Sequence, residues 1–246
     1  MYYLFKRYFS CKNRLLFVFI LLFFYTPKSF SAKNDSIPVI DYIFNFDFKS
    51  ADNELKKGSS DNLVINHVLG LEMKWWVAME SGLYEDLDDF LACLYGFETL
   101  HTDDFSKVVT LTYRLRYFAL KEEKVKILLT LFSINNFLSK ISTEELNHYE
   151  PVYIEMFSLY RSFLNLITYN YSIERFISGT AGKTMIIEEI EEIVNNGYNV
   201  NKTLGRYFLM KYYLEIDCNK PKANDYLVVL HKQFPGNTIF NTLLTI

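Results

Sequence analysis

Apolar residues recur at intervals of three and four along most of the chain, which is the spacing of one face of an α-helix. The runs in the first half are Val64, Val68, Leu71, Trp75 and Met79; Leu83, Leu87, Phe90, Leu94 and Phe97; and Phe105, Val108, Thr112 and Leu115. The later runs are Leu128, Leu131, Phe132 and Leu138; Val152, Met156, Leu159, Phe163, Leu166, Ile173 and Ile177; Ile186, Ile190 and Ile193; Leu204, Tyr207 and Phe208; and Ala223, Leu227 and Leu230. We expect each run to form one helix whose apolar stripe faces the core.

Short polar segments separate these runs, at 57–62, 81–82, 102–104, 121–123, 195–197 and 217–220. Residues 39–150 contain no proline, and an interior proline costs a helix about 3 kcal/mol. Ser142-Thr143-Glu144-Glu145 has the spacing of a capping box at a helix start. No segment alternates apolar and polar residues between hairpin turns, so we predict an all-α chain of roughly ten helices, with successive helices antiparallel.

Three segments carry the small residues, turns and proline of a helical repeat. Ala223 lies twelve residues before Pro235, as in the second helix of a repeat whose small residue packs on the preceding helix. Segment 43–51 looks like a helix end, a tight turn and the small residue that opens the next helix, and segment 111–121 looks like a similar junction. With Trp75-Trp76 and the ending Phe234-Pro235-Gly236-Asn237, residues 38–246 resemble secreted bacterial tetratricopeptide-repeat (TPR) proteins.

The resemblance implies a fold and a kind of function. It implies a right-handed TPR-like solenoid of antiparallel helix pairs, about five of them, with a concave face that binds protein or peptide. It implies no catalysis. Lys126 and Lys211 depart from the repeat pattern, because each stands where a small helix-contact residue is expected.

The first 32 residues have the pattern of an export signal. Four basic residues lie within 1–14, eleven apolar residues follow at 15–25, and small residues stand at Ser29 and Ser31. Because the apolar run is shorter than a membrane span of about 20 residues, we predict a signal peptide, 1–32, cleaved after Ser31 or Ala32. An uncleaved anchor is the alternative. Cleavage would leave one TPR-like domain, 33–246, exported to the periplasm or envelope or secreted, with no stable membrane span.

Cleavage also changes the net charge. The whole chain has 26 Lys and Arg against 29 Asp and Glu, and residues 1–31 hold five basic side chains and no acidic one. The mature chain therefore has 21 basic and 29 acidic side chains, a net charge near −8. A surface of that sign repels phosphate backbones, so we do not expect nucleic acid as a partner.

Two cysteines remain after cleavage, Cys93 and Cys218. They pair in an oxidising compartment, or both are small buried apolar side chains. The place of Cys93 between Ala92 and Leu94, in an apolar helical run, favours burial.

Sequence motifs for catalysis and for metal or nucleotide binding are missing. Segment 178–184 looks like a phosphate-binding loop, but Ile177 stands where its first glycine belongs and the preceding residues have helical periodicity. The glutamates at 188, 189, 191 and 192 are expected on a solvated face. The histidines lie far apart, at His67, His101, His148 and His231. We therefore expect no enzyme activity, no cofactor and no metal site.

The candidate binding residues are aromatic and arginine side chains near the apolar stripes. Adjacent helix residues differ by about 100° around the axis. We therefore expect Trp75 in the core and Trp76 toward a neighbouring repeat or the groove. Tyr and Arg side chains beside the stripe of 105–115 are expected on one exposed face, where they offer contact area and directional donors to a protein or peptide. The proposed set is Trp76, Tyr95, Tyr113, Arg114 and Tyr117.

Two functions of different class follow from the sequence. The first is an exported helical-repeat scaffold that binds a protein or peptide partner and catalyses nothing. The second is an all-helical envelope hydrolase or small-ligand-binding protein whose site carries no sequence motif. A groove lined by Tyr, Arg and Trp would support the first, and a closed pocket with convergent Asp, Glu or His would support the second.

Overall fold

Helices make up the regular structure of the chain. The computed structural model describes residues 38–57, 63–141, 149–171 and 181–245, and over these ranges it contains helices and no strand. The helices are α2 (Pro38–Phe44), α3 (Phe48–Lys57), α4 (Leu63–Ser81), α5 (Tyr84–Leu100), α6 (Asp104–Leu120), α7 (Lys124–Leu138), α8 (Pro151–Tyr171), α10 (Ala181–Asn196), α11 (Asn199–Lys211), a π-helical turn (Tyr212–Ile216), α12 (Lys220–Gln233) and α13 (Thr238–Leu243). The predicted all-α class is confirmed.

Three of the described helices, α6, α12 and α13, begin with a polar side chain that caps the first turn. The Asp103 side chain accepts a hydrogen bond from the backbone N–H of Ser106 at the start of α6 (3.0 Å), which satisfies a donor that the first turn leaves free. Asn219 and Asn237 cap α12 and α13 in the same way. Gly82, between α4 and α5, has a φ of 64°, a conformation that costs glycine little.

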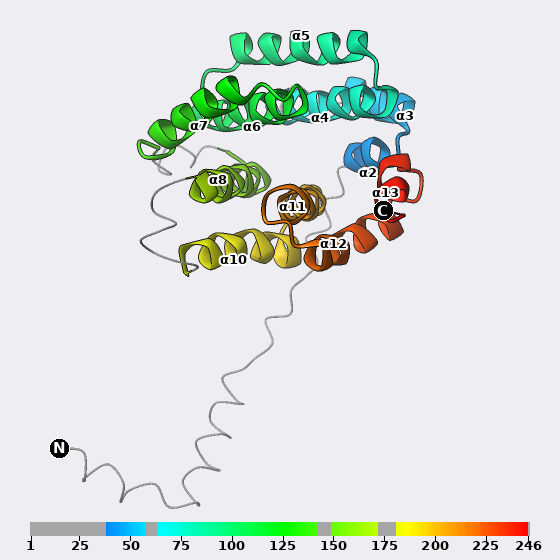
Figure 1. Cartoon of the computed structure of the whole chain (residues 1–246). Coiled ribbons are helices and arrows are strands. Elements are labelled where there is room, and N and C mark those ends of the chain that lie inside the picture. The colour runs from blue at the N-terminus through cyan, green and yellow to red at the C-terminus, as the bar shows by residue number, and fades with distance from the viewer. Residues whose placement is uncertain (1–37, 58–62, 142–148, 172–180, 246) are drawn as a thin grey trace, which may run out of the picture. The chain divides into compact units, whose positions relative to one another are not determined.

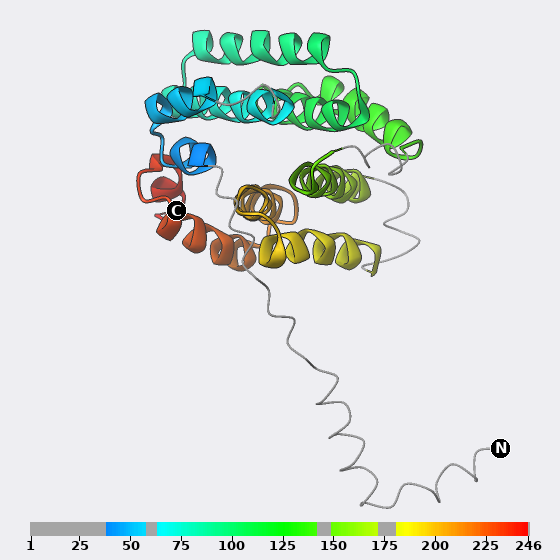
Figure 2. The same cartoon turned by 180° about the vertical axis from the view of Figure 1, so that it is seen from behind.

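Consecutive helices pack in five successive pairs: α2 with α3, α4 with α5, α6 with α7, α8 with α10, and α11 with α12. Figures 1 and 2 show α5 on the outside of α4 and α6, with α8 and α11 on the other side of that layer and α10 and α12 beyond them. Helix α8 contacts α6, α7, α10 and α11, so it lies at the centre of the packing.

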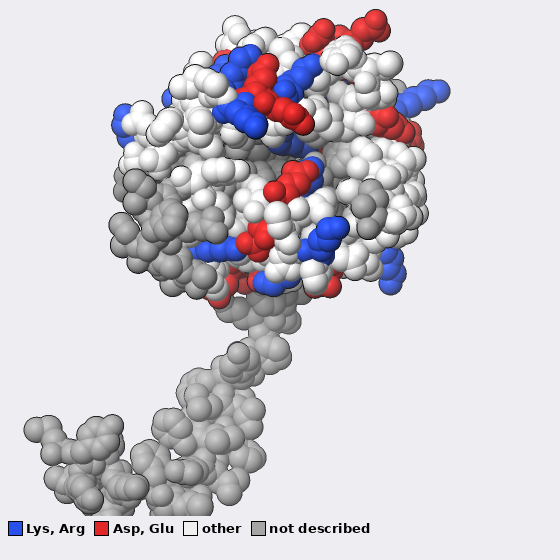
Figure 3. Space-filling model, in the orientation of Figure 1, with Lys and Arg blue, Asp and Glu red and all other residues white. Residues whose placement is uncertain are grey.

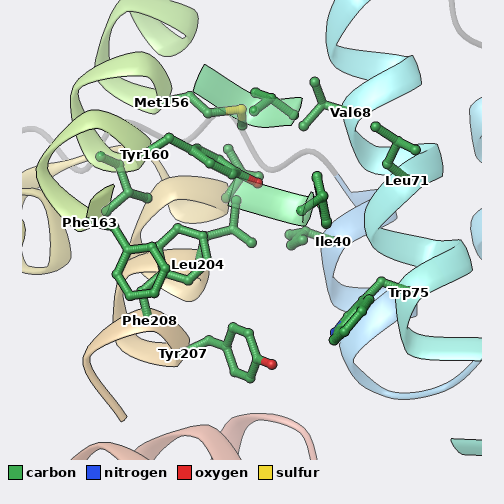
Figure 4. Close-up of a cluster of buried hydrophobic side chains, with 14 of the residues drawn as sticks. Ile40, Val68, Leu71, Trp75, Met156, Tyr160, Phe163, Leu204, Tyr207 and Phe208 are labelled. Carbon is green, nitrogen blue, oxygen red and sulfur yellow. The ribbon is translucent and has the colours of Figure 1, made fainter. Parts of the chain in front are cut away.

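Aromatic side chains from distant helices fill the core. Phe163 of α8 stacks on Phe208 of α11, with ring centroids 4.3 Å apart and planes at 14°, and Tyr160 meets Phe208 edge-on at 5.2 Å. Figure 4 shows these rings where α8 and α11 meet, together with Met156 and Leu204, with α4 opposite them. Most residues of the predicted apolar stripes are buried, as expected.

Part of the predicted core is on the surface. Leu128 is 52% exposed and Phe132 is 72% exposed, although both belong to the apolar stripe expected to be buried, and Leu83 is 57% exposed at the start of α5. The prediction is wrong for these residues. Of that predicted stripe α7 buries Leu131, and it also buries Ile134, so its buried face is rotated away from Leu128 and Phe132.

The first described helix lies against the last ones. The ring of Phe44 is 5.9 Å from Tyr207, 5.3 Å from Phe234 and 6.2 Å from Phe240, measured between centroids. Asn237 Nδ2 donates to the carbonyl oxygen of Phe44 (3.0 Å). In an open solenoid each repeat contacts only its neighbours. Here residues nearly the whole described chain apart are in contact.

Neither cysteine expectation agrees with the structure. Cys93 and Cys218 are free and exposed. Leu94 takes the buried position on α5 next to Cys93, and Cys218 lies in the turn before α12 with a φ of 53°. The predicted signal peptide, the capping box at 142–145, His148, and Ile173 and Ile177 lie outside the described residues. Among the described helices, none is long and apolar enough to cross a membrane.

Candidate functional site

A buried carboxylate brings two of the predicted binding residues together inside the core. Glu72 of α4 is 1% exposed and accepts hydrogen bonds from Trp76 Nε1 (2.8 Å) and from the hydroxyl of Tyr113 on α6. Trp76 is 1% exposed and Tyr113 is fully buried. The expectation of an exposed face is wrong for Tyr113, whose ring packs near Phe90 of α5. Trp76 packs on Phe44 of α2, so it points toward a neighbouring helix pair, which is one of its two expected places, and not into a groove.

Arg116 completes this cluster. Its Nη1 donates to Glu72 Oε2 (2.8 Å), and its guanidinium lies 4.4 Å from the ring centroid of Trp75 and 5.3 Å from that of Tyr207. Burial disfavours the charged guanidinium, but the Glu72 carboxylate and nearby phenols outweigh it, so the pKa of Arg116 lies above its ordinary value. Burial, then Glu72, raises the pKa of Tyr113. Both side chains keep their protons throughout the physiological range.

The other predicted residues lie along α5 and α6. Arg114 is paired with Glu98 of α5, with Nη2 donating to Oε2 at 2.7 Å, and it remains partly exposed. Tyr95 is 54% exposed, whereas Tyr117 is 9% exposed and packs edge-on against Phe118. Of the proposed set, only Tyr95 and Arg114 present substantial surface. The structure does not assemble the five residues into one groove.

A cavity of about 250 Å³ opens between α6, α7, α8 and α11, and we call it the inner cavity. Its walls are mostly apolar. They include the side chains of Leu115, Ile127, Leu131, Phe163, Ile167 and Phe208. The polar groups gather from α6, α11 and the π-helical turn: Arg116, Tyr207, Lys211 and Glu215. Such a cavity has the composition of a small-ligand pocket, which is mainly apolar with a few directed polar groups.

The polar groups of the inner cavity are connected to one another. Arg116 Nη2 lies 3.4 Å from the hydroxyl of Tyr207, and Lys211 forms an ion pair with Glu215. Burial disfavours the Lys211 ammonium, but Tyr207 and Glu215 outweigh it and raise its pKa. Lys211 therefore carries a full positive charge at neutral pH.

The π-helical turn shapes this end of the cavity. The backbone N–H of Asp217 donates to the carbonyl of Tyr212, five residues earlier (3.0 Å). The turn places Tyr212, Glu215 and Ile216 on the cavity wall. Single π-helical turns within α-helices are rare and occur frequently at functional sites. The turn also ties α10 to this region, because Lys183 pairs with Asp217. Lys183, the lysine of segment 178–184 that looks like a phosphate-binding loop, is thus paired with a carboxylate from another part of the chain.

An apolar surface adjoins the inner cavity. It consists of Val125, Leu128, Leu129 and Phe132 on α7 with Tyr171 at the end of α8, and we call it the α7 face. These are five of the thirteen large apolar side chains exposed in the described part, with exposed fractions of 52 to 72%. A smaller cavity of about 120 Å³ between α7 and α8 shares Leu131 and Tyr171 with the inner cavity.

Figure 3 shows no large patch of a single sign of charge on the face that it draws. Acidic and basic side chains there are interspersed among uncharged ones over the described surface. Apolar contact, more than a field of one sign, is what the α7 face offers a partner. The sequence already indicates the α7 face, because α7 has more apolar residues than a single buried side of a helix can hold.

Two other groups of titratable side chains come together outside the inner cavity. His67 Nδ1 lies 2.8 Å from His101 Nε2, which brings together two of the histidines that are distant in sequence. Burial, followed by His67, lowers the pKa of His101. Over the described ranges, no three His, Cys, Asp or Glu side chains are placed to hold a metal ion. Glu189 and Glu191, expected on a solvated face, accept hydrogen bonds from Ser162 and Tyr226.

Comparison with known proteins adds no relative to this picture. No protein-family model, no curated protein and no solved structure matches the chain.

Proposed function

We propose that this chain is an exported, TPR-like helical-repeat protein that binds a protein partner through the α7 face and catalyses nothing. The observation that carries the proposal is the concentration of large exposed apolar side chains on α7 and the end of α8. Contiguous apolar surface of this kind on a folded protein marks an interaction site. The partner segment that fits it has an apolar side, with one side chain entering the cavity beside Phe132.

The helix order supports a repeat origin. Each described helix packs on the next along the chain, and these contacts can be grouped into the five antiparallel pairs that the TPR-like interpretation predicts. Because Trp76 is buried and α2 contacts the end of α12 and α13, the proposal uses the exposed apolar side of α7 and not a concave groove lined by Trp76.

Site-specific photo-crosslinking tests the proposal in the cell that makes the protein. A photoreactive phenylalanine derivative replaces Phe132 in one variant and Met185 in the other. Met185 is the matched control, because it is 65% exposed but lies on α10, apart from the α7 face. We expect a discrete protein adduct at position 132 and none at position 185.

A second pair of variants checks that the adduct reports binding. Phe132→Asp should abolish capture of the adduct partner by the purified protein, and Met185→Asp should leave capture unchanged, both with unaltered helix content. An adduct formed with a second copy of the chain, or with lipid and no protein, would replace the proposed partner with that one. The absence of any adduct at position 132 would reject the α7 face as the binding surface.

A further inference from the structure

The inner cavity has a polar end that protein docking on the α7 face would not use. A guanidinium has five N–H donors. Arg116 Nη1 makes one hydrogen bond of ordinary length, to Glu72, whereas Nη2 is 3.4 Å both from Glu72 Oε1 and from the Tyr207 hydroxyl. Those two contacts are longer than the 2.7–3.2 Å typical of N–H···O bonds. Buried donors are almost always satisfied, so the Arg116 guanidinium can donate further to an acceptor in the cavity.

Both cations at this end are paired with a carboxylate, and one of the two pairs is exposed enough for a ligand to exchange with it. Arg116 is balanced by the buried Glu72, and Lys211 by Glu215 on the cavity rim. Glu215 is about half exposed, and such a surface pair contributes little to stability. A ligand carboxylate can therefore share or replace Glu215 as the partner of Lys211. A dianion would meet two carboxylates and is disfavoured.

The rest of the cavity is suited to a short hydrocarbon chain. Leu131, Phe163 and Phe208 line it, together with other apolar side chains. Its volume of about 250 Å³ holds roughly eight groups of about 30 Å³ each, the share of one water molecule in the liquid. Burial of each methylene contributes about 0.8 kcal/mol to the transfer from water. The hydrocarbon chain of such a ligand would therefore provide affinity, and its polar head group would fix its orientation in the cavity.

We propose that the inner cavity binds a medium-chain monocarboxylate of roughly six to ten carbons. The carboxylate accepts hydrogen bonds from Arg116, Tyr207 and Lys211, and the chain lies among Leu131, Phe163 and Phe208. This ligand site goes beyond the proposed protein-binding function and does not depend on it, since Tyr171 is the one residue of the α7 face that also lines the inner cavity.

Titration calorimetry of the full chain with octanoate tests the site, with 1-octanol and octyl phosphate as comparison ligands. We expect saturable 1:1 binding of octanoate, and at least about tenfold weaker binding of both 1-octanol and octyl phosphate. Lys211→Gln should weaken octanoate binding about tenfold and leave 1-octanol binding unchanged, because only the head contact is lost. Lys202→Gln, on the same helix but away from the cavity, should bind octanoate like the natural chain.

A second variant fills the cavity without touching its charges. Ala119 lines the cavity and is exposed, so Ala119→Phe should abolish octanoate binding while helix content and melting temperature stay unchanged. Ala92→Phe, at an exposed position on α5, is the matched control. Equal binding of octanoate and 1-octanol, tighter binding of octyl phosphate, unaltered binding by both Lys211→Gln and Ala119→Phe, or no saturable binding of octanoate would each overturn the proposal.

Discussion

At the scale of single residues, Glu72 connects two helices through one carboxylate. It receives hydrogen bonds from Trp76 on its own helix and from Tyr113 and Arg116 on α6. Replacing a buried ion pair by apolar residues is often neutral, but removing one partner leaves an uncompensated buried charge. The cluster therefore determines which side chains may face one another more than it determines how stable the fold is.

The first prediction separates the buried pair from an exposed one. Glu72→Ala should lower the free energy of unfolding by about 3–5 kcal/mol, because it leaves the buried Arg116 guanidinium without its carboxylate partner. Glu98→Ala, which breaks the partly exposed pair with Arg114, should cost about 0–1 kcal/mol. Urea unfolding followed by tryptophan fluorescence measures both. The double variant Glu72→Leu with Arg116→Leu should recover part of the loss, and equal losses in the two single variants would contradict the assignment.

The second prediction concerns pH and the His67–His101 pair. The folded protein holds the pKa of His101 below its ordinary value of 6.5, through burial first and His67 second, while Asp103 opposes the shift. As pH falls, His101 is therefore protonated at a higher pH in the unfolded chain than in the folded protein. The contribution of neutral His101 to stability is present above about pH 6.5 and is lost as pH falls through the pKa of the folded state. Melting temperature should decline between pH 7.5 and 5.5, and less steeply in His101→Gln. Parallel profiles for the two proteins would rule out His101 as the cause.

At the scale of elements, hydrophobic periodicity identified the helices but could not choose a face where a helix is apolar all round. Helix α7 has one apolar side with Leu131 and Ile134 and another with Leu129 and Phe132. Only the neighbouring helices α6 and α8 decide which is buried. The same limit applies to α4, where Trp75 and Trp76 are both in the core because α2 and α5 pack on different sides. The π-helical turn and the cavity beside it have no periodic signal at all.

The third prediction compares glycines inside helices. A Cβ added at Gly205 of α11 would lie 2.8 Å from Val194 Cγ2 on α10, whereas nothing lies within 4 Å of one added at Gly70 of α4. Gly205→Ala should destabilise the fold by about 1–3 kcal/mol through overpacking. Gly70→Ala should stabilise it by roughly 0.5–1 kcal/mol, because alanine is the better helix former. Thermal unfolding measures both, and stabilisation by Gly205→Ala would show that α10 and α11 separate easily.

At the scale of the whole described unit, Asn237 is one of the residues that join its two ends. Asn237 is fully buried, and its side chain accepts from the Phe240 N–H to cap α13 while donating to the Phe44 carbonyl in α2. An asparagine can do both at once because its amide has a donor and an acceptor end. An aspartate can only cap.

The fourth prediction uses that difference. Asn237→Asp keeps the cap but sets a buried carboxylate against the Phe44 carbonyl, so it should destabilise the fold by about 1–3 kcal/mol and speed hydrogen exchange in α2. Asn219→Asp, at the exposed cap of α12, is the control and should change neither. Exchange measured by mass spectrometry on peptides from 38–44 decides the point. Faster exchange confined to α13 would mean that the ends are not coupled.

The meeting of Phe44 with Phe234 and Phe240 also sets an order of events for a chain made from its N-terminus. Phe44 and Trp76 pack on each other early, but the sides of their rings that contact Tyr207 and Phe240 have no partner until the last helices are synthesised, so that part of the surface stays exposed to solvent and chaperones for most of synthesis. Closing a contact across nearly two hundred residues carries a loop entropy cost that neighbour-to-neighbour helix pairs avoid. Folding should therefore finish in a late, slow step, and a chain cut short before residue 234 should remain a substrate for proteolysis, however many helices it has already formed.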